Sequence, residues 1–166
     1  MPTTFAAAEL IPALSPEETA AIAAEIAHAP EPASAMIEAL RIVQRHRGWV
    51  SDQSVEAIAR QLGTSAASVD SVATFYNLIF RQPVGRHVVM FCDSVSCYVM
   101  GCDKLRGALE QKLGVAPGET TPDGRFTLLP IVCLGACDHA PAMMIDEDLI
   151  LDAAPQLLDG ILGGYL

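Results

Sequence analysis

The chain of 166 residues is 51% hydrophobic and contains five cysteines. This length and composition are typical of an ordinary globular protein, and the odd number of cysteines argues against a purely disulfide-based scaffold. With 10 basic and 20 acidic residues the formal net charge is −10, opposite in sign to that of proteins that bind phosphate backbones, so we expect no nucleic-acid partner.

The first half of the sequence predicts four helices that pack into a small bundle. They are expected within residues 15–30, 33–48, 51–63 and 64–80. Ser15 and Glu18 form a capping-box pattern at the start of the first helix, and apolar residues recur at helical spacing in the other three. Helical spacing places Phe75 and Tyr76 in the core, with a subunit contact as the alternative.

A break in the helical pattern separates the two halves of the chain. The stretch RQPVGR, residues 81–86, contains a proline and a glycine, and we place the domain boundary there. The expected domains are a helical bundle over residues 1–85 and a second domain over residues 86–166. The acidity is concentrated in the second domain, because residues 87–166 hold 4 basic and 11 acidic residues, a net charge of −7.

The second half predicts a small mixed sheet with helices on its faces. The β-branched run HVVMF predicts a strand that ends at Cys92, and RFTLLPIV predicts a second strand that leads into Cys133. A helix is expected between these strands, from Gly101 to Gly114, then a hairpin formed by AMMID and LILD, and a final helix from Pro155. The fold class is therefore α+β, a helical bundle followed by a thioredoxin-like α/β domain.

The five cysteines form two groups with distinct spacing. Cys92, Cys97 and Cys102 are five positions apart, and Cys133 and Cys137 form the second group. Cys92 is expected at the end of its strand and Cys97 on the loop that follows. Spacing alone does not choose between the pair of Cys92 with Cys97 and the pair of Cys97 with Cys102, because both are C-x4-C.

Three kinds of site commonly use paired cysteines, and the spacing distinguishes among them. Four thiolates on two loops suit a [2Fe-2S] cluster, and the gaps of four and three residues favour it over a structural zinc site, which normally uses a tighter C-x2-C. A thioredoxin-type dithiol requires C-x-x-C, which the sequence lacks. Gly135 is expected to let the second loop turn so that backbone N–H groups point at the sulfurs. His139 is interpreted as a loop residue rather than a ligand.

Two further expectations concern the cell. The N-terminal stretch MPTTFAAAELIPALS has no basic region before an apolar one, so we do not expect secretion. The longest apolar stretch, FTLLPIVCLGAC, is shorter than the roughly 20 residues that cross a bilayer, so we expect no direct membrane insertion.

Several segments together resemble a known family. GWVSD, VATFYNLIFRQPVGRHVV, CDSVSC, DGRFTLLP and CLGACDHAPAMMIDED are similar to the E subunits of bacterial NADH:quinone oxidoreductase, respiratory complex I, which are thioredoxin-like [2Fe-2S] ferredoxins. The resemblance implies one [2Fe-2S] cluster, and its four ligands map onto Cys92, Cys97, Cys133 and Cys137. Cys102 then stands outside the site.

The resemblance also implies a position and a partner. The chain would be a peripheral component on the cytoplasmic side of the inner membrane, beside the flavin-bearing, NADH-oxidising F subunit and the rest of the peripheral arm. FMN and NADH would bind to that partner, and this chain, which has no G-x-G-x-x-G segment, would exchange single electrons with the flavin. The alternatives are the same module in an NAD-linked hydrogenase or formate dehydrogenase, and a zinc-stabilised, non-redox assembly module.

Overall fold

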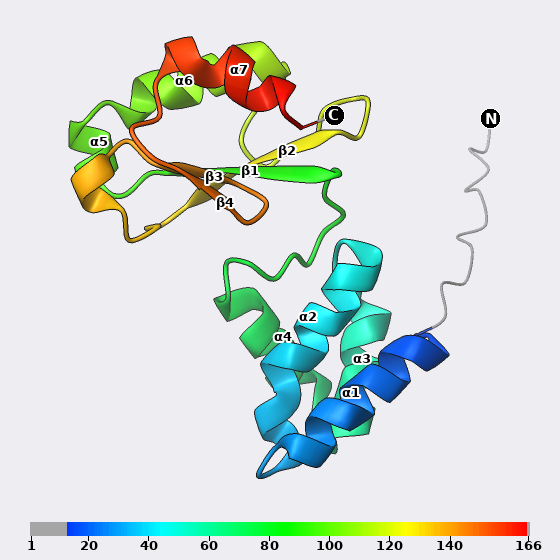
Figure 1. Ribbon diagram of the computed structural model, residues 1–166. Helices are drawn as coiled ribbons and strands as arrows, with labels where there is room; N and C mark the ends of the chain where they lie inside the picture. Colours follow the sequence, from blue (N-terminus) through cyan, green and yellow to red (C-terminus); the bar gives the residue numbers. More distant parts are fainter. Residues whose placement is uncertain (1–12, 166) are drawn as a thin grey trace, which may run out of the picture. The chain divides into compact units, whose positions relative to one another are not determined.

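The structure is a computed structural model that describes residues 13–165, and these fall into two compact units divided between Gln82 and Pro83 (Figure 1). Each unit has its own hydrophobic core. No helix among the described residues is both long and apolar enough to cross a lipid bilayer.

The first unit is the expected helical bundle. Its elements are α1 (Pro16–His28), the short 3-10 helix η1 (Pro32–Ala35), α2 (Met36–Arg47), α3 (Asp52–Leu62) and α4 (Ala66–Phe75). The apolar faces of these helices meet in one core, whose fully buried members include Ile22, Ala39, Leu40, Val43, Val50, Ile58, Val69 and Ala73. Several helices begin after a serine cap or end before a glycine in the left-handed conformation, where the sequence pattern predicts. Helix α3 does both, with Ser51 at its start and Gly63 at its end.

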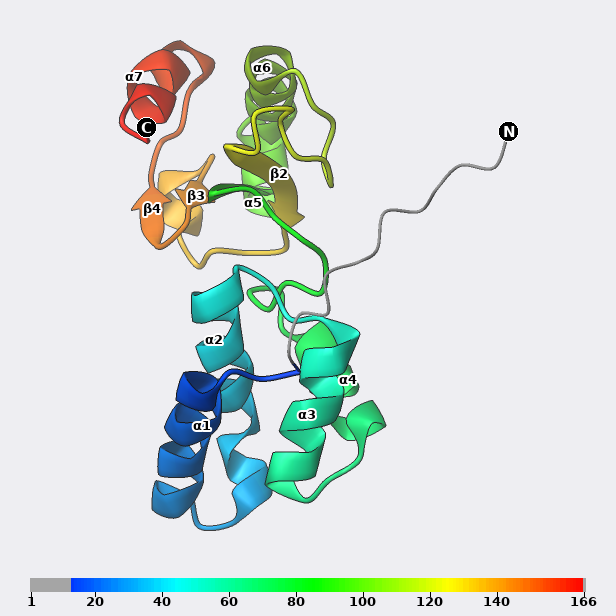
Figure 2. The ribbon, with the colours of Figure 1, turned by 90° about the vertical axis from the view of Figure 1, so that its right-hand side faces the viewer.

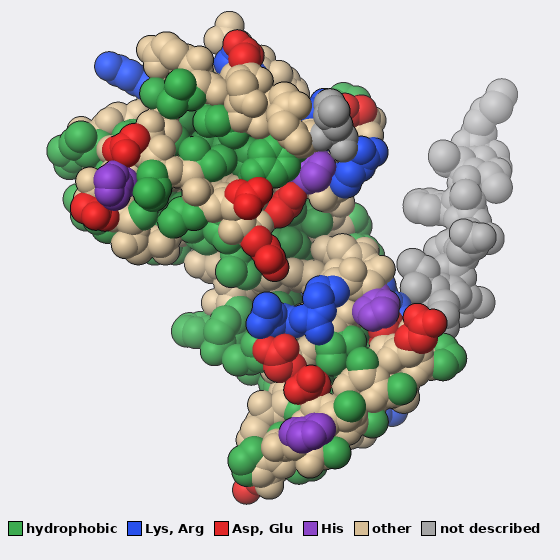
Figure 3. Space-filling model, viewed as in Figure 1, with side chains coloured by type: hydrophobic (Ala, Val, Ile, Leu, Met, Phe, Trp, Pro, Cys, Tyr) green, Lys and Arg blue, Asp and Glu red, His purple; other side chains and the backbone are tan. Residues whose placement is uncertain are grey.

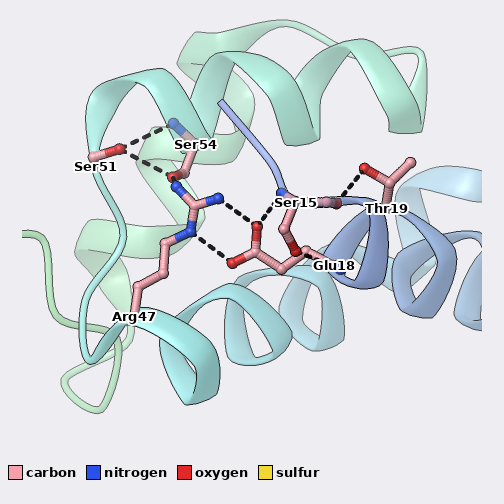
Figure 4. A network of polar contacts seen from close by, with 6 residues as sticks. All are labelled: Ser15, Glu18, Thr19, Arg47, Ser51 and Ser54. Atoms are coloured by element: carbon pink, nitrogen blue, oxygen red, sulfur yellow. Dashed lines mark hydrogen bonds and ion pairs between the residues drawn. The ribbon is translucent and has the colours of Figure 1, made fainter. Parts of the chain in front are cut away.

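A buried ion pair connects α1 to the end of α2 (Figure 4). Glu18 completes the predicted capping box, because its carboxylate accepts the N–H of Ser15 at 2.7 Å while its own N–H donates to the Ser15 hydroxyl. The same carboxylate, which is only 1% exposed, receives two hydrogen bonds from Arg47, one from Nε at 2.6 Å and one from Nη2. Arg47 also reaches the hydroxyl of Ser54 on α3. The capping box at the start of α1 is thus part of the interior of the bundle through its buried Glu18.

The fourth helix ends earlier than the sequence predicts. It stops at Phe75, and Tyr76 adopts an extended backbone that turns the chain back toward α2. There the Gln44 side chain accepts the N–H of Phe80 at 2.6 Å and donates to the carbonyl of Leu78 at 2.7 Å. The expectation that Phe75 and Tyr76 are core residues is wrong, because they are 79% and 43% exposed. Phe75 is the last residue of α4 and lies two residues beyond the buried Ala73, on another side of the helix, and Tyr76 follows the end of the helix.

The second unit is built on a four-stranded mixed sheet, as expected. Its elements are β1 (His87–Cys92), α5 (Val95–Val99), α6 (Cys102–Leu113), β2 (Phe126–Ile131), the 3-10 helix η2 (Cys137–His139), β3 (Met143–Ile145), β4 (Asp148–Ile150), the 3-10 helix η3 (Pro155–Leu157) and α7 (Leu158–Gly163). The strand order is β2-β1-β3-β4, with β1 parallel to β2 and antiparallel to β3. The α+β fold class is confirmed.

Helices α6 and α7 lie on the same side of this sheet (Figures 1 and 2). Leu105 and Leu109 of α6 and Leu158 of α7 are fully buried against it. The residues that the sheet contributes to this core are Val89, Phe91, Phe126, Leu128, Met143 and Ile145. Packing from two helices fixes the sheet, and the sheet in turn fixes the ends of its strands, where the cysteines lie.

Candidate metal centre

The parallel pairing of β1 and β2 brings the two cysteine-bearing segments to the same end of the sheet. Cys92, the last residue of β1, is in register with Ile131, the last residue of β2. Beyond this point Asp93 N–H donates to the Ile131 carbonyl at 3.1 Å, and the Cys92 thiol lies 3.6 Å from the carbonyl oxygen of Val132. Cys133 follows directly, so both turns start side by side.

Cys97 lies on a short helix, and the expectation that it lies on a loop is wrong. It is the only buried residue of α5, whose other four residues are partly or fully exposed. Two sequence signals could have indicated this helical turn: Ser94 directly before the helix and Gly101 after it. Gly101 adopts the left-handed conformation, with φ of +100°. The helix allows the chain to leave β1, bury one thiol beneath itself and enter α6.

Three thiols are buried together on this side of the site. Cys92, Cys97 and Cys102 are each 2% exposed. Burial raises the pKa of Cys97, a hydrogen bond with the backbone of Ala142 opposes that shift, and the neighbouring thiols raise it further. Burial and the nearby Asp103 carboxylate raise the pKa of Cys102, which is the first residue of α6. The raised pKa values hold Cys97 and Cys102 as neutral thiols.

The second pair is exposed and already close. The sulfurs of Cys133 and Cys137 are 3.9 Å apart, which matches the spacing of about 3.8 Å expected for two thiolates at about 2.3 Å from one tetrahedral metal ion. Gly135 between them has φ of +77°, and its N–H donates to the Cys133 sulfur at 3.4 Å. The tight turn and the aimed N–H group predicted for Gly135 are thus confirmed. The donor chemistry of this pair fits either iron or zinc.

The two pairs are not assembled into one four-ligand cage. Among residues 13–165, no three or more histidine, cysteine, aspartate or glutamate side chains are close enough together to hold a metal ion. Instead, the buried thiols of Cys92 on β1 and Cys97 on α5 lie beside an exposed pair, Cys133 and Cys137, after β2. The assignment of Cys92, Cys97, Cys133 and Cys137 as the ligand set therefore stays a prediction, and four thiols on two adjacent turns are a donor set that fits a [2Fe-2S] cluster.

His139 sits two residues after Cys137 but faces carboxylates. Its Nδ1 donates to Asp152 at 2.9 Å, its Nε2 lies 3.7 Å from Asp138, and its backbone carbonyl accepts the N–H of Asp152. The hydrogen bond to Asp152 and the charges of both carboxylates raise the pKa of this histidine. Through these contacts His139 fastens the 3-10 turn of Cys137 to the segment after β4, in keeping with its interpretation as a loop residue.

Comparisons with known proteins match most of the chain to one family. The family model of the thioredoxin-like [2Fe-2S] ferredoxins matches residues 22–166. The E subunit of NADH-quinone oxidoreductase from Escherichia coli (strain K12) is 55% identical over 150 residues, which cover 88% of this chain and 90% of that protein. The E subunit of the same enzyme from Pseudomonas aeruginosa is 50% identical over 153 residues and 92% of both chains.

A solved structure shares the fold at lower identity. An NAD+-reducing [NiFe]-hydrogenase, determined in the air-oxidized state, matches with a TM-score of 0.66 at 22% sequence identity. The match covers 78% of this chain and 22% of the hydrogenase chain, so the likeness concerns one part of a longer protein. It shows the fold alone.

Proposed function

The chain belongs to the thioredoxin-like [2Fe-2S] ferredoxins and, among them, to the family of NADH-quinone oxidoreductase E subunits, and on this premise we propose that it is the one-electron carrier beside the flavin of such a complex. The observation that supports this most directly is the pair of cysteine turns at one end of the sheet, with Cys133 and Cys137 at metal-chelating distance. The chain is thus part of an oxidoreductase and holds no complete active site of its own.

Cys92, Cys97, Cys133 and Cys137 would together hold one [2Fe-2S] cluster. When bound, a [2Fe-2S] cluster supplies a one-electron acceptor, with a total charge of −2 including the four thiolates that becomes −3 on reduction. The residues around the four cysteines must therefore tolerate the negative charge of the cluster and its thiolates. The Gly135 N–H stabilises it at the exposed pair, while the burial of Cys92 and Cys97 keeps water from the other pair.

The partner is proposed from the family and is compatible with the chemistry of NADH. NADH delivers two electrons as a hydride to FMN, whereas this chain would take one, so the flavin has to divide the pair between two acceptors. We propose that the flavin lies on the NADH-oxidising F subunit, within the peripheral arm on the cytoplasmic side of the inner membrane. The curated relatives are named as subunits of NADH-quinone oxidoreductase, which supports the part of this proposal that places the chain in such a complex.

Two other functions remain to be separated from this one by experiment. One is a variant in which the same module serves an NAD-linked hydrogenase or formate dehydrogenase; the NAD+-reducing hydrogenase shares the fold of this chain. Identity of 50–55% over about nine-tenths of the chain, compared with 22% for the hydrogenase, favours the quinone-reducing complex. The zinc-stabilised, non-redox module is the other alternative, because zinc also accepts four cysteines.

Metal and sulfide analysis of the purified full chain tests the proposal. We expect about two irons and about two acid-labile sulfides per chain, a visible absorption spectrum, and an electron paramagnetic resonance (EPR) signal after reduction. One zinc ion per chain and a colourless protein would contradict it. Co-purification then identifies the complex, because the flavoprotein should be accompanied by membrane-arm proteins rather than by a nickel or a molybdenum protein.

A further inference from the structure

The second cysteine turn, residues 133–138, is fastened to the rest of its unit by the residues that follow it. In the described part of the chain, every hydrogen bond of this turn lies within residues 133–139. Cys137 is exposed and begins the three-residue 3-10 helix η2. The position of the Cys137 sulfur therefore depends on contacts made directly after it in the chain.

His139 and Asp152 make a two-point contact between this turn and the segment after β4. The Nδ1 of His139 donates to the Asp152 carboxylate at 2.9 Å, and the Asp152 N–H donates to the His139 carbonyl, also at 2.9 Å. The N–H of the buried Ala153 continues the connection, donating to the Pro141 carbonyl at 2.7 Å. In Figure 3, histidine and acidic side chains gather at the surface of the second unit on the side where Figure 1 labels α5.

The backbone of Asp152 is uncommon for a residue with a side chain. Its φ of +49° lies in the left-handed region, where aspartate is one of the few residues found besides glycine. In this conformation both its N–H and its carboxylate contact His139. Backbone conformations of this kind persist where the surrounding contacts hold them, and they occur often at functional sites. The pair thus differs from a chance contact between exposed side chains.

We propose that His139 and Asp152 are positioning residues for Cys137, and that their contact holds its sulfur at the metal-binding distance of 3.9 Å from the sulfur of Cys133. This inference rests on the proposed function, because it concerns the exposed pair of cluster ligands. Both residues act through the turn without touching the metal. A metal ion binds more tightly when its ligands are already in place, since less conformational freedom is lost on binding.

A second histidine–aspartate pair in the same unit provides a matched control. The Nδ1 of His87 donates to Asp146 at 2.7 Å, and Asp146 likewise has a left-handed backbone, with φ of +54°. His87 is the first residue of β1 and Cys92 is the last, so this pair lies at the other end of the strand from the cysteine turns. Its loss should loosen the unit without moving Cys137.

The test measures zinc binding by the exposed pair alone, in the metal-free full chain with the three buried cysteines replaced by alanine. The affinity for Zn²⁺, determined by competition with a chromophoric chelator, should fall about fivefold in His139→Ala and in Asp152→Gly, the effect of one hydrogen bond. Asp152→Gly keeps the left-handed backbone and its N–H, so it removes the side-chain contact alone. His87→Ala should leave the affinity unchanged while lowering the midpoint of urea unfolding.

His139→Asn is the rescue variant. The side-chain N–H of asparagine can donate to Asp152 in place of the histidine Nδ1, so the affinity for Zn²⁺ should stay close to that of the unsubstituted position. Binding as weak as in His139→Ala would overturn the inference, and tight binding by Asp152→Gly in the same series would make His139 a ligand instead. An affinity that is unchanged in His139→Ala, or that falls equally in His87→Ala, would overturn it as well.

The chain loaded with iron and sulfide, with all its cysteines present, separates this inference from the proposed function. His139→Ala should release iron to a chelator about fivefold faster than the wild type, whereas His139→Asn and His87→Ala should not. Equal release rates from chains that hold iron and sulfide would overturn the positioning role and leave the proposed function standing. A wild-type chain that binds zinc but neither iron nor sulfide would contradict the proposed function, and the zinc affinities alone would then decide the role of His139.

Discussion

The N–H of Gly135 points at the sulfur of Cys133 from 3.4 Å, inside the turn that holds Cys137 at 3.9 Å from the same sulfur. The left-handed backbone of Gly135, with φ of +77°, makes this geometry possible, and no atom lies where a side chain would be added. Backbone strain is therefore the only obstacle to a side chain here. A substitution of Gly135 can therefore perturb the hydrogen bond from its N–H to the Cys133 sulfur without placing atoms between the cysteines.

Gly135→Ala is expected to lower the midpoint potential of the bound cluster. Alanine strains the left-handed turn, the N–H moves off the sulfur, and the reduced state, which is more negative, loses more stabilisation than the oxidised state. Loss of a hydrogen bond of about 1 kcal/mol corresponds to about 40 mV for one electron. A redox titration followed by EPR measures it. Gly118→Ala, also at positive φ but in the loop after α6, is the control. Equal potentials in both variants would contradict the role of this hydrogen bond.

Alanine substitution of any of the four assigned ligands should abolish the visible spectrum and the EPR signal of the reduced protein. Cys102→Ala should leave both intact, because Cys102 begins α6 and is assigned no iron. The comparison is sharp because Cys92, Cys97 and Cys102 are equally buried, so a general packing defect would affect all three alike. Loss of the signal in Cys102→Ala with retention in Cys92→Ala would mean that the pair is Cys97 with Cys102.

The buried pair of Glu18 and Arg47 should make the first unit sensitive to acid. Burial raises the pKa of Glu18, but hydrogen bonds from Arg47 and from the Ser15 backbone outweigh it and hold the pKa below its ordinary value of 4.5. Because the folded pKa is the lower one, this stabilisation is complete above about pH 4.5 and is lost as the pH falls through the folded value.

Glu18→Gln tests that linkage. We expect it to lower the free energy of unfolding by about 1–3 kcal/mol near neutral pH and by much less in acid, where the wild-type carboxylate is protonated. Chemical denaturation followed by far-UV circular dichroism gives both values. Glu17→Gln, at an exposed position of the same helical turn, should change neither. An equal loss at every pH would show that the charge of Glu18 is not the cause.

Gln44→Ala should detach the segment that follows α4. The amide of Gln44 pairs with both the Phe80 N–H and the Leu78 carbonyl, so its removal leaves the partly buried Phe80 N–H and the exposed Leu78 carbonyl without these partners. We expect a loss of about 1–3 kcal/mol in unfolding free energy and faster amide hydrogen exchange at Phe80. Gln53→Ala, at an exposed position of α3, serves as the control. Unchanged exchange at Phe80 would show that the Gln44 contacts carry little energy.

Tyr165 should ionise only in strong base. Its hydroxyl donates to Asp148 at 2.7 Å, and this hydrogen bond, with burial and the charge of the carboxylate, raises the pKa of Tyr165 to about 12. Asp148→Asn removes the charge and should bring the pKa down toward about 10. The ultraviolet absorbance of tyrosinate reports it in a background of Tyr76→Phe and Tyr98→Phe. Asp159→Asn, whose native partner is Lys112, should leave the pKa unchanged.

Local signals in the sequence predicted most of the elements. Caps such as Ser15, Ser51 and Gly48 depend on the residue and its immediate neighbours, so they are readable without the fold. The strands that end at Cys92 and before Cys133 were predicted for the same reason, from short β-branched runs. The left-handed turn at Gly135 also followed from its place between two cysteines.

Features that depend on distant partners were not predictable. The contact of Glu18 with Arg47 joins residues 29 positions apart, and the capping-box pattern gives no indication of it. The end of α4 at Phe75 depends on Gln44, more than 30 positions earlier, which binds the backbone that would otherwise continue the helix. The helical turn α5, which buries Cys97, was likewise not predicted, because a helix of five residues is too short to show an apolar period.

Because Cys92 is in register with Ile131, the number of residues in β1 decides whether the two cysteine turns lie side by side. Successive side chains of a strand point to opposite faces, so one extra residue within β1 would send the Cys92 sulfur to the wrong face of the sheet. Two extra residues would restore the face but advance the sulfur by about 7 Å along the strand. Neither insertion leaves it beside Val132. The length of β1 is therefore constrained far more tightly than that of the loop from Gly114 to Arg125, which can lengthen while the strands keep their register.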